Sequence, residues 1–341
     1  MLRRWIESWE HAIWTDDADQ RRSQPFGWGL EELDGLLPER LRELPPRRAL
    51  LALARQLCAD SESFYQAPPI ADAALAGQRL RFTSPLPPRY PEVARASARL
   101  FESSRARGRA VIVIPQWNAD EDSHLRACKI LNAAGMTALR LTLPYHEERR
   151  PAAMLRADPM VSPILGLTLQ AVRRAVLEVR QLVDWLWQRG YRQIGLLGSS
   201  LGSCIGFLAL THEPRLVAAA FNHVAATFAD VVWTGLATRH IRASLEPHVD
   251  LPTLRECWGP ISPGLFVSRL VASAPGLLMI SGAYDPTFLP QHSRALVAAL
   301  RAHDLDFRRI VLPCGHYTLG RPPFYLIDAF LVAAFLRRRL S

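Results

Sequence analysis

Residues 198–202 read Gly-Ser-Ser-Leu-Gly and centre on Ser200. A serine in this G-x-S-x-G pattern acts as a nucleophile when a sharp turn between a strand and a helix exposes its hydroxyl. An apolar run at residues 193–197 precedes the pattern, and another at 201–210 follows it. The two glycines remove side chains that would clash with neighbouring backbone. The sequence therefore predicts that Ser200 is a nucleophile, and the alternative is a tight turn without catalysis.

A serine hydroxyl is a weak nucleophile and needs a general base, which in turn needs an orienting acid. The expected order along such a chain is nucleophile, acid and base. Asp285 lies four residues after the predicted strand 277–281, and His316 lies four residues after the predicted strand 308–312. The spacing predicts that Ser200, His316 and Asp285 work together. The alternatives are a turn-forming aspartate before a proline and an ordinary loop histidine.

The elements that would position these residues alternate between strands and helices. The run 110–114 is continuously apolar, as in a strand buried on both faces, and residues 166–189 carry apolar side chains every three or four positions. This alternation predicts an α/β fold with a mainly parallel, twisted sheet flanked by helices. Strands are predicted at 80–84, 110–114, 137–143, 193–197, 217–221, 277–281 and 308–312, and helices at 124–134, 166–189, 201–210 and 324–337.

Two segments stand outside this alternation. Residues 1–78 are polar with helical stretches and predict a helical N-terminal extension to a main domain at 79–341. Residues 225–275 are too long for an ordinary strand–helix connection. We expect them to form a small lid or cap insertion above the carboxyl ends of the strands, where Trp233 and Trp258 would supply an apolar surface.

From about residue 79 to 340, with the motif at 198–202, Asp285 and His316 as anchors, the chain resembles the α/β-hydrolase superfamily. It is most similar to single-chain esterases such as dienelactone hydrolases and acetyl xylan esterases, in a bacterial branch. The resemblance implies an α/β-hydrolase fold and a Ser–His–Asp hydrolase. It does not name the substrate.

Such a hydrolase needs backbone N–H groups that hold the negative oxygen of the intermediate. One donor should be the N–H of Leu201, directly after the nucleophile. Members of the superfamily often carry His-Gly after the strand that ends here at Ile114, whereas this chain has Pro-Gln-Trp-Asn at 115–118. We expect the second donor to be the N–H of Trp117, with Gln116 as the near alternative. Simple core packing is the other interpretation of the tryptophan.

Several further side chains follow strand ends or lie in the insertion, where they could contact a substrate: Gln116, His146, His223, Trp233 and His240. A solvated loop for His146 and a structural histidine for His223 are the alternatives. The acidic stretch at 120–124 ends in a histidine and could be mistaken for a metal site. It is more simply the first turn of a helix, since acidic residues are favoured there. We expect no metal and no cofactor.

The composition narrows the class of protein. The chain has 341 residues, 49% hydrophobic and 21% charged, which excludes a disordered chain. The formal net charge is +9, but Lys129 is the one lysine among 41 basic residues and no nucleic-acid-binding motif accompanies the arginines. We therefore expect no nucleic-acid partner. No apolar run is long enough for a membrane span.

Localisation follows from weaker signals. The five cysteines are widely spaced without a CxxC pair, which argues against a disulfide framework or a zinc site. Residues 1–14 mix charged and apolar side chains and lack the core of a signal peptide. These signals favour a cytoplasmic protein, and the oligomeric state stays open.

Together these observations predict a serine hydrolase that cleaves a small-molecule carboxylic ester through an acyl-enzyme. Another acyl transfer at the same residues (to or from an amide, thioester or alcohol) is the first alternative. A non-catalytic binding protein that kept the fold is the second. Because His316 must be neutral to act as a base, we expect activity to fall below about pH 6 to 6.5.

Overall fold

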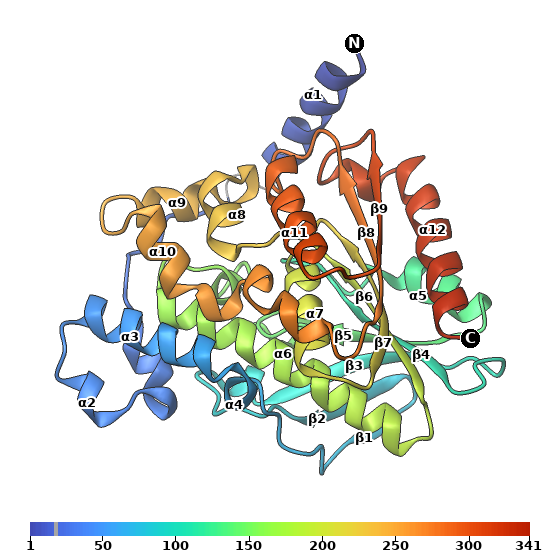
Figure 1. Cartoon of the computed structure of the whole chain (residues 1–341), viewed down its shortest axis with the longest axis horizontal. Coiled ribbons are helices and arrows are strands. Elements are labelled where there is room, and N and C mark those ends of the chain that lie inside the picture. Colours follow the sequence, from blue (N-terminus) through green and yellow to red (C-terminus); the bar gives the residue numbers. More distant parts are fainter. Residues whose placement is uncertain (17–19) are drawn as a thin grey trace.

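A nine-stranded sheet with helices on its faces organises the residues that the computed structural model describes, 1–16 and 20–341 (Figure 1). The spatial order is β1-β2-β3-β5-β4-β6-β7-β8-β9. The first three pairings in this order, from β1 to β5, are antiparallel. The remaining pairings, from β5 through β4 to β9, are parallel. The strands are β1 (Ala74–Ala76), β2 (Arg79–Thr83), β3 (Arg95–Phe101), β4 (Arg109–Ile114), β5 (Thr137–Thr142), β6 (Gln193–Ser199), β7 (Leu216–Asn222), β8 (Gly276–Gly282) and β9 (Phe307–Leu312).

The predicted α/β class and mainly parallel sheet are confirmed, and each expected strand and helix overlaps an observed one. The sequence did not predict β1, β3 or α11, and β1 lies within the extension that was expected to be helical. The helices are α1 (Leu2–Thr15), α2 (Glu39–Arg42), α3 (Pro46–Ala59), α4 (Ser61–Phe64), α5 (Leu125–Ala133), α6 (Leu165–Gln188), α7 (Leu201–His212), α8 (Phe228–Thr234), α9 (Arg239–Leu245), α10 (Leu251–Cys257), α11 (Pro290–Ala302) and α12 (Phe324–Arg339). None of these helices, in the part of the chain that the structure describes, is long and apolar enough to cross a membrane.

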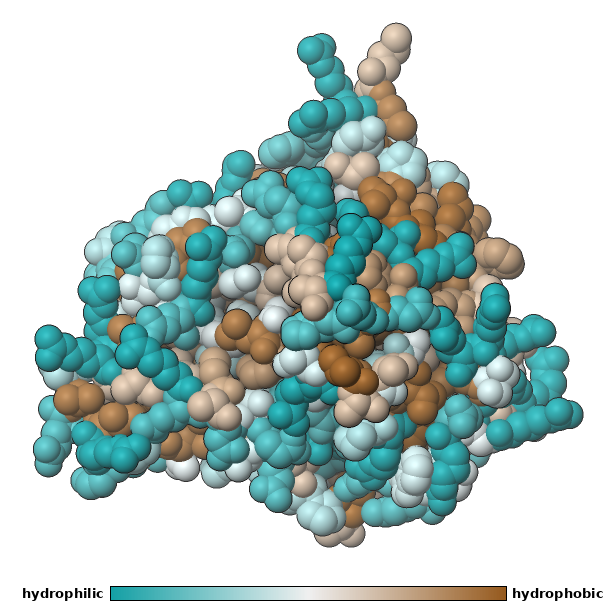
Figure 2. Space-filling view, in the orientation of Figure 1, coloured by the Kyte–Doolittle hydropathy of each residue, from teal (hydrophilic) through white to brown (hydrophobic). Residues whose placement is uncertain are grey.

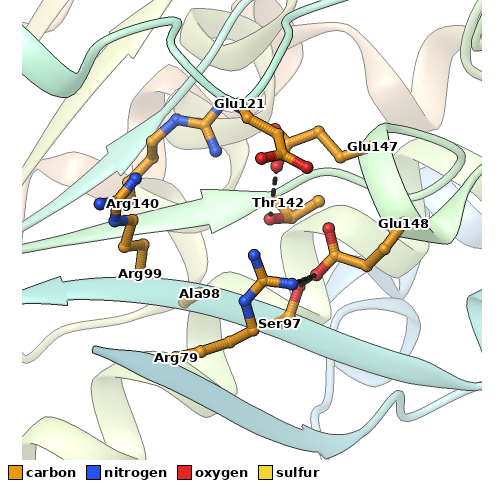
Figure 3. A pocket seen from close by; sticks show the side chains of 9 residues that line it. All are labelled: Arg79, Ser97, Ala98, Arg99, Glu121, Arg140, Thr142, Glu147 and Glu148. Carbon is orange, nitrogen blue, oxygen red and sulfur yellow. Dashed lines mark hydrogen bonds and ion pairs between the residues drawn. The ribbon is translucent and has the colours of Figure 1, made fainter. Parts of the chain in front are cut away.

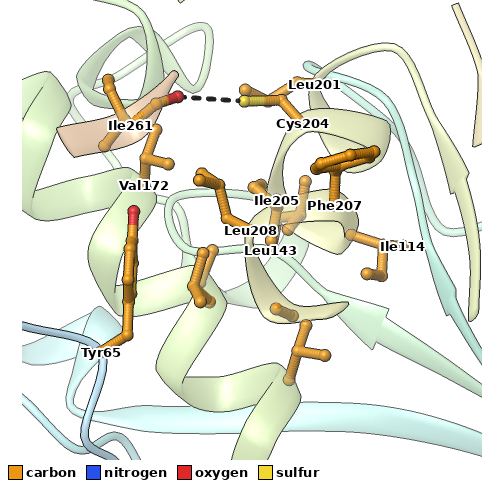
Figure 4. Packing of buried hydrophobic residues seen from close by; sticks show 14 of the residues in the cluster. Tyr65, Ile114, Leu143, Val172, Leu201, Cys204, Ile205, Phe207, Leu208 and Ile261 are labelled. Atoms are coloured by element: carbon orange, nitrogen blue, oxygen red, sulfur yellow. Dashed lines mark hydrogen bonds between the residues drawn. The ribbon is translucent and has the colours of Figure 1, made fainter. Parts of the chain in front are cut away.

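Helix α7 is buried along its whole length and forms the centre of the core. Figure 4 shows its apolar side chains packed between β4, the long helix α6, Tyr65 of the N-terminal extension and Ile261 of the insertion. Each fully buried Leu, Ile or Phe side chain stabilises the fold by about 1.5 to 3 kcal/mol. Because α7 begins directly after Ser200, this packing fixes the position of the serine.

The N-terminal extension and the insertion are packed against each other. Arg47 on α3 donates to the hydroxyl of Thr253 on α10 at 2.9 Å, and the hydroxyl of Tyr65 donates to the carbonyl of Pro260 at 2.8 Å. The sheet itself reaches into the extension, since β1 pairs with β2. The extension therefore packs against the insertion and the sheet and does not form a separate unit.

The structure corrects the expected lid in one respect. Trp258 is 0% exposed, packs edge-on against Phe228 and donates from its indole nitrogen to the carbonyl of Leu165 on α6 at 3.1 Å. Trp258 is thus a core residue between the insertion and α6, and it offers no surface to a ligand. Figure 2 shows apolar residues in separate patches on one face of the molecule, with hydrophilic residues between them.

The glycines of the motif bring β4, β6 and α7 close together. A Cβ atom on Gly202 would lie 2.2 Å from the carbonyl oxygen of Ile114, and one on Gly198 would lie 2.6 Å from that of Gly202. Both distances are far inside contact distance, and the obstacles are backbone atoms that cannot turn aside. The first turn of α7 can therefore approach the end of β4 only with glycine at these positions.

We predict that Gly202→Ala lowers the free energy of unfolding by about 1 to 3 kcal/mol, because the added methyl group forces the first turn of α7 away from β4. Denaturant unfolding followed by tryptophan fluorescence measures this change. Gly35→Ala is the matched control, since no atom lies within 4 Å of its added Cβ. An equal effect of the two substitutions would contradict the close contact described above.

Candidate active site

Ser200 occupies the sharp turn between β6 and α7, as the motif predicts. Its backbone has φ 55° and ψ −119°, a region that L-residues rarely adopt. The strain is held by hydrogen bonds: the N–H of Ser200 donates to the carbonyl of Asn222 on β7 at 2.8 Å, and the hydroxyl of Ser203 donates to the same oxygen at 2.7 Å. The turn pushes the Ser200 side chain out of the sheet at the carboxyl ends of the strands.

Two loops at the same edge bring Asp285 and His316 to this serine. The Nε2 atom of His316 lies 3.1 Å from the Oγ of Ser200, and its Nδ1 lies 3.1 Å from the Oδ2 of Asp285. The loops are held together because the N–H of Tyr284 donates to the carbonyl of Cys314 at 3.0 Å. A continuous chain of hydrogen bonds thus joins Ser200 to two residues that lie far along the sequence. Asp285 follows Ser200 by 85 positions, and His316 follows it by 116.

Asp285 is buried and held in one orientation. Its Oδ1 accepts the backbone N–H groups of Thr287 at 2.8 Å and Phe288 at 2.7 Å, which leaves Oδ2 facing the histidines. Burial by itself would raise the pKa of this carboxyl, but His316 and His223 outweigh it and hold the pKa well below its usual range. The carboxylate is therefore charged at neutral pH.

His316 carries the opposite shift. Burial alone would lower the pKa of its imidazole, but the Asp285 carboxylate and, further away, Glu10 raise it above the ordinary value. The ring is also fixed by packing, since Phe288 stacks on it with ring centroids 5.4 Å apart and planes within 7°. Its base strength is therefore higher than that of a free histidine.

His223 lies closer to the acid than the sequence indicates. It follows β7 with φ 57°, is buried, and places its Nδ1 2.7 Å from the Oδ2 of Asp285. Its ring centroid is 4.6 Å from that of His316. Two imidazoles thus share one carboxylate oxygen, and the pair is an ion pair only when His223 is protonated.

The same three side chains form a possible metal-binding set. One ligand atom each from His223, Asp285 and His316 lie within 4.8 Å of one another, and zinc accepts such nitrogen and oxygen donors. In this arrangement, however, both nitrogens of His316 already face other partners, one toward Ser200 and one toward Asp285. This arrangement favours proton transfer between these side chains over the binding of a metal ion. The acidic stretch at 120–124 is not part of any three-residue donor group among the described residues.

The loop after β4 lies beside the start of α7, where oxyanion donors are expected. The N–H of Leu201 opens the helix and has no partner within it. In residues 1–16 and 20–341, the backbone N–H groups of Gln116 and Trp117 donate to no backbone acceptor. The next N–H, of Asn118, donates to Nε2 of His146 at 2.8 Å. The N–H groups of Leu201, Gln116 and Trp117 therefore stay candidates for the oxyanion donors.

His146 and Asn118 fix that loop. The Nδ1 of His146 lies 2.9 Å from the carbonyl of Pro144, and its Nε2 accepts from Asn118, so both ring nitrogens are used by backbone groups. Burial lowers the pKa of His146 to about 4, which keeps the ring neutral. The Oδ1 of Asn118 accepts from the N–H of Ala157 at 2.8 Å. The structure thus places His146 beneath the loop that carries Trp117.

The remaining predicted contact residues lie on or near the insertion. The indole of Trp117 donates to the carbonyl of Ala157 at 2.8 Å and lies parallel to the ring of His240 on α9, with centroids 6.2 Å apart. Trp233 on α8 is partly exposed and packs under the guanidinium of Arg242. Gln116 reaches the hydroxyl of Ser123 at 3.4 Å. Trp117 and His240 thus form a contact between the loop after β4 and the insertion.

Two groups near the site were missed by the sequence analysis. Glu10 of α1 bonds to the backbone just after His316, and the Nε2 of His124 lies 2.9 Å from the hydroxyl of Ser199. The signal for Glu10 was present but weak: it lies four residues after Ile6 on the face of α1 that also carries Trp9. A charged residue on the apolar face of an amphipathic helix indicates a buried partner.

A polar hollow of about 20 Å³ lies elsewhere on the molecule (Figure 3). It is lined by ion pairs such as Arg140 with Glu147 at 2.7 Å and Arg79 with Glu148 at 3.3 Å, on β2, β3, β5 and the following loop. Its volume accommodates about one water molecule. None of the predicted catalytic or contact residues lines it.

Comparison with known proteins identifies the fold. Residues 117–245 match the model of the family described as alpha/beta hydrolase domain containing 18. No curated protein matches the sequence. Among solved structures, the acetyl xylan esterase of a Thermoanaerobacterium species superposes with a TM-score of 0.60 at 16% identity, covering 93% of this chain and 100% of that one.

Peptidases also share the fold. A puromycin-hydrolyzing peptidase of Mycobacterium tuberculosis gives a TM-score of 0.57 at 14% identity over 74% of this chain, and the acylaminoacyl peptidase of Pyrococcus horikoshii gives 0.59 at 13% over 82%. The chain spans 38% and 43% of the length of these two proteins. The predicted resemblance to the α/β-hydrolase superfamily is thus confirmed: this chain has the α/β-hydrolase fold.

We predict that His316 titrates above the ordinary histidine value of about 6.5 and that Asp285→Asn lowers its pKa, because burial then acts without the carboxylate. Titration of the imidazole resonances by NMR measures both values. His146, with a pKa of about 4, is the internal reference for a buried ring without a carboxylate partner. A His316 pKa that does not change in Asp285→Asn would contradict this electrostatic assignment.

Proposed function

We propose that the protein is a serine hydrolase that cleaves carboxylic esters through an acyl-enzyme intermediate. The observation that carries this proposal is the chain of hydrogen bonds from Ser200 through His316 to Asp285, with the serine in a strained turn at the start of α7. Strain of this kind persists only where the surrounding structure over-determines it, and it is concentrated at functional sites.

In the first half of the reaction, the Oγ of Ser200 attacks the acyl carbonyl while Nε2 of His316 accepts its proton. Asp285 holds the imidazole in the required tautomer and stabilises the cation that forms. The N–H groups of Leu201 and Trp117, or of Gln116 as the alternative, hold the negative oxygen. The imidazolium then protonates the leaving alcohol, which departs and leaves the acyl group on Ser200.

In the second half, His316 takes a proton from water, which attacks the acyl-enzyme and releases the carboxylic acid. The proton returns to Ser200, and the enzyme is regenerated without a cofactor. The substrate-contact residues we propose are Trp233 and His240 of the insertion, with His223 beside the acid. The ester class rests on the esterases that share the fold, and amide cleavage is the alternative that the fold equally accommodates.

We predict that Ser200→Ala lowers the turnover of 4-nitrophenyl acetate and butyrate by about 10⁴-fold or more, because the nucleophile is lost. Ser199→Ala is the matched control, since it removes the neighbouring hydroxyl, which contacts His124, and we expect it to keep most of the activity. An activated phosphonate that labels serine should add its mass to wild type and to Ser199→Ala but not to Ser200→Ala.

The same assay separates the alternatives. Rapid turnover of the matching 4-nitroanilides would point to amide cleavage, and product formation with an added alcohol would point to acyl transfer. Equal rates in wild type and Ser200→Ala would remove Ser200 as the nucleophile, and a binding protein that kept the fold would then be the better explanation.

We predict that kcat/KM for ester hydrolysis falls on the acidic side with a midpoint above about pH 6.5, higher than the sequence by itself indicates. The sign follows from the raised pKa of His316, because the ring loses its ability to accept a proton at every pH below that value. A pH–rate profile from pH 5 to 9 measures the midpoint. A profile that stays flat down to pH 5 would argue against His316 as the base.

A further inference from the structure

Helix α1 stands apart from the sheet and meets the rest of the molecule along one face. Figure 1 shows it projecting from the end of the molecule that carries the candidate site, and Figure 2 shows its bare tip. Of α1, all of which the structure describes, only Ile6 and Glu10 are buried, whereas Trp5 is 58% exposed. The contact that holds α1 in place is therefore confined to a few side chains.

Glu10 is the polar part of that contact, and it ends directly behind His316. Its Oε2 accepts the backbone N–H of Tyr317 at 3.0 Å, and its Oε1 accepts that of Thr318 at 2.7 Å. These are the two residues that follow the histidine in the chain. A carboxylate from the tenth residue thus fixes the backbone of a loop more than 300 positions away.

The loop leaves room for this carboxylate. A Cβ atom on Gly315 would lie 2.4 Å from the Cδ of Glu10, and the N–H of Gly315 instead turns back to the hydroxyl of Thr318 at 2.8 Å. Glu10 is 0% exposed. Burial of a carboxylate costs several kcal/mol unless hydrogen bonds replace its water. The two N–H bonds supply that replacement, so α1 docks only when the histidine loop has this shape.

The charge of Glu10 also acts on the imidazole. The titratable groups around His316 are Asp285 and His223 from the ends of β8 and β7, Tyr317 beside it in the loop, and Glu10 from α1. Glu10 raises the pKa of His316 in the same direction as Asp285, although it bonds to the backbone and not to the ring. Glu10 therefore affects both the position of His316, through the backbone of its loop, and the pKa of its imidazole.

We propose that Glu10 is a positioning residue for His316: the N-terminal helix inserts a buried carboxylate that holds the histidine loop in register with Ser200. This proposal rests on the proposed function for the role of His316. It assigns a part in the reaction to the N-terminal extension, which has no such part in the sequence analysis.

The test compares three variants of the full chain. Glu10→Gln keeps the shape of the side chain and removes its charge, Glu10→Asp keeps the charge and shortens the reach, and Glu7→Gln is the control. Glu7 lies one turn earlier on the same helix and pairs with Arg3 on the exposed side. The measurements are kcat and KM for ester hydrolysis, the NMR titration of His316 and the thermal midpoint.

For Glu10→Gln we expect a fall in kcat of about tenfold with KM within about twofold, because the misplaced loop affects the chemical step more than substrate binding. We also expect a downward shift in the pKa of His316, because the charge of Glu10 no longer favours the imidazolium. Glu10→Asp should lower kcat but leave that pKa near the wild-type value, and Glu7→Gln should change neither.

The proposal is overturned if Glu10→Gln matches Glu7→Gln in both kcat and the pKa of His316. It is also overturned if both Glu10 variants lower kcat only in proportion to lost thermal stability, with the pKa unmoved, since Glu10 would then act on stability alone. Absence of turnover in wild type would sink the proposed function instead. In that case the NMR titration still decides whether Glu10 acts on His316.

Discussion

The close backbone contact between the end of β4 and the first turn of α7 is the constraint on which the site depends. Gly202 allows it, since any side chain there would meet the carbonyl of Ile114. The contact forces the chain to reverse at Ser200 within one residue, which accounts for the positive φ. It also brings the loop after β4 next to the start of α7. The strained turn at Ser200 and the position of that loop are therefore consequences of one packing event.

The electrostatics of the site depend on one buried carboxylate. Asp285 gives one oxygen to two backbone N–H groups and the other to the imidazoles of His316 and His223. A buried charge is tolerated only when it is fully paired. This pairing keeps Asp285 ionised and raises the pKa of His316. The site therefore differs from a row of three residues, Ser200, His316 and Asp285. The imidazole of His223 contacts the same Asp285 oxygen as His316.

The N-terminal extension and the insertion are parts of the domain that carries the site. The extension supports the insertion through Arg47 and Tyr65, and its first helix delivers Glu10 to the histidine loop. The insertion in turn buries Trp258 against α6 and brings His240 beside Trp117. Segments that are distant in sequence thus meet around the loops that follow β4 and β9. The shape of the site depends on these contacts as much as on the sheet.

The sequence alone determined the alternation of strands and helices, the turn at Ser200 and the positions of Asp285 and His316 just past strand ends. It could do so because buried parallel strands are continuous apolar runs and because their carboxyl ends meet at one edge. Tertiary structure alone decided that Glu10 and His223 join this group, that Trp258 is core and that His146 supports a loop. These roles depend on contacts between residues far apart in the chain, which no local pattern of residue types encodes.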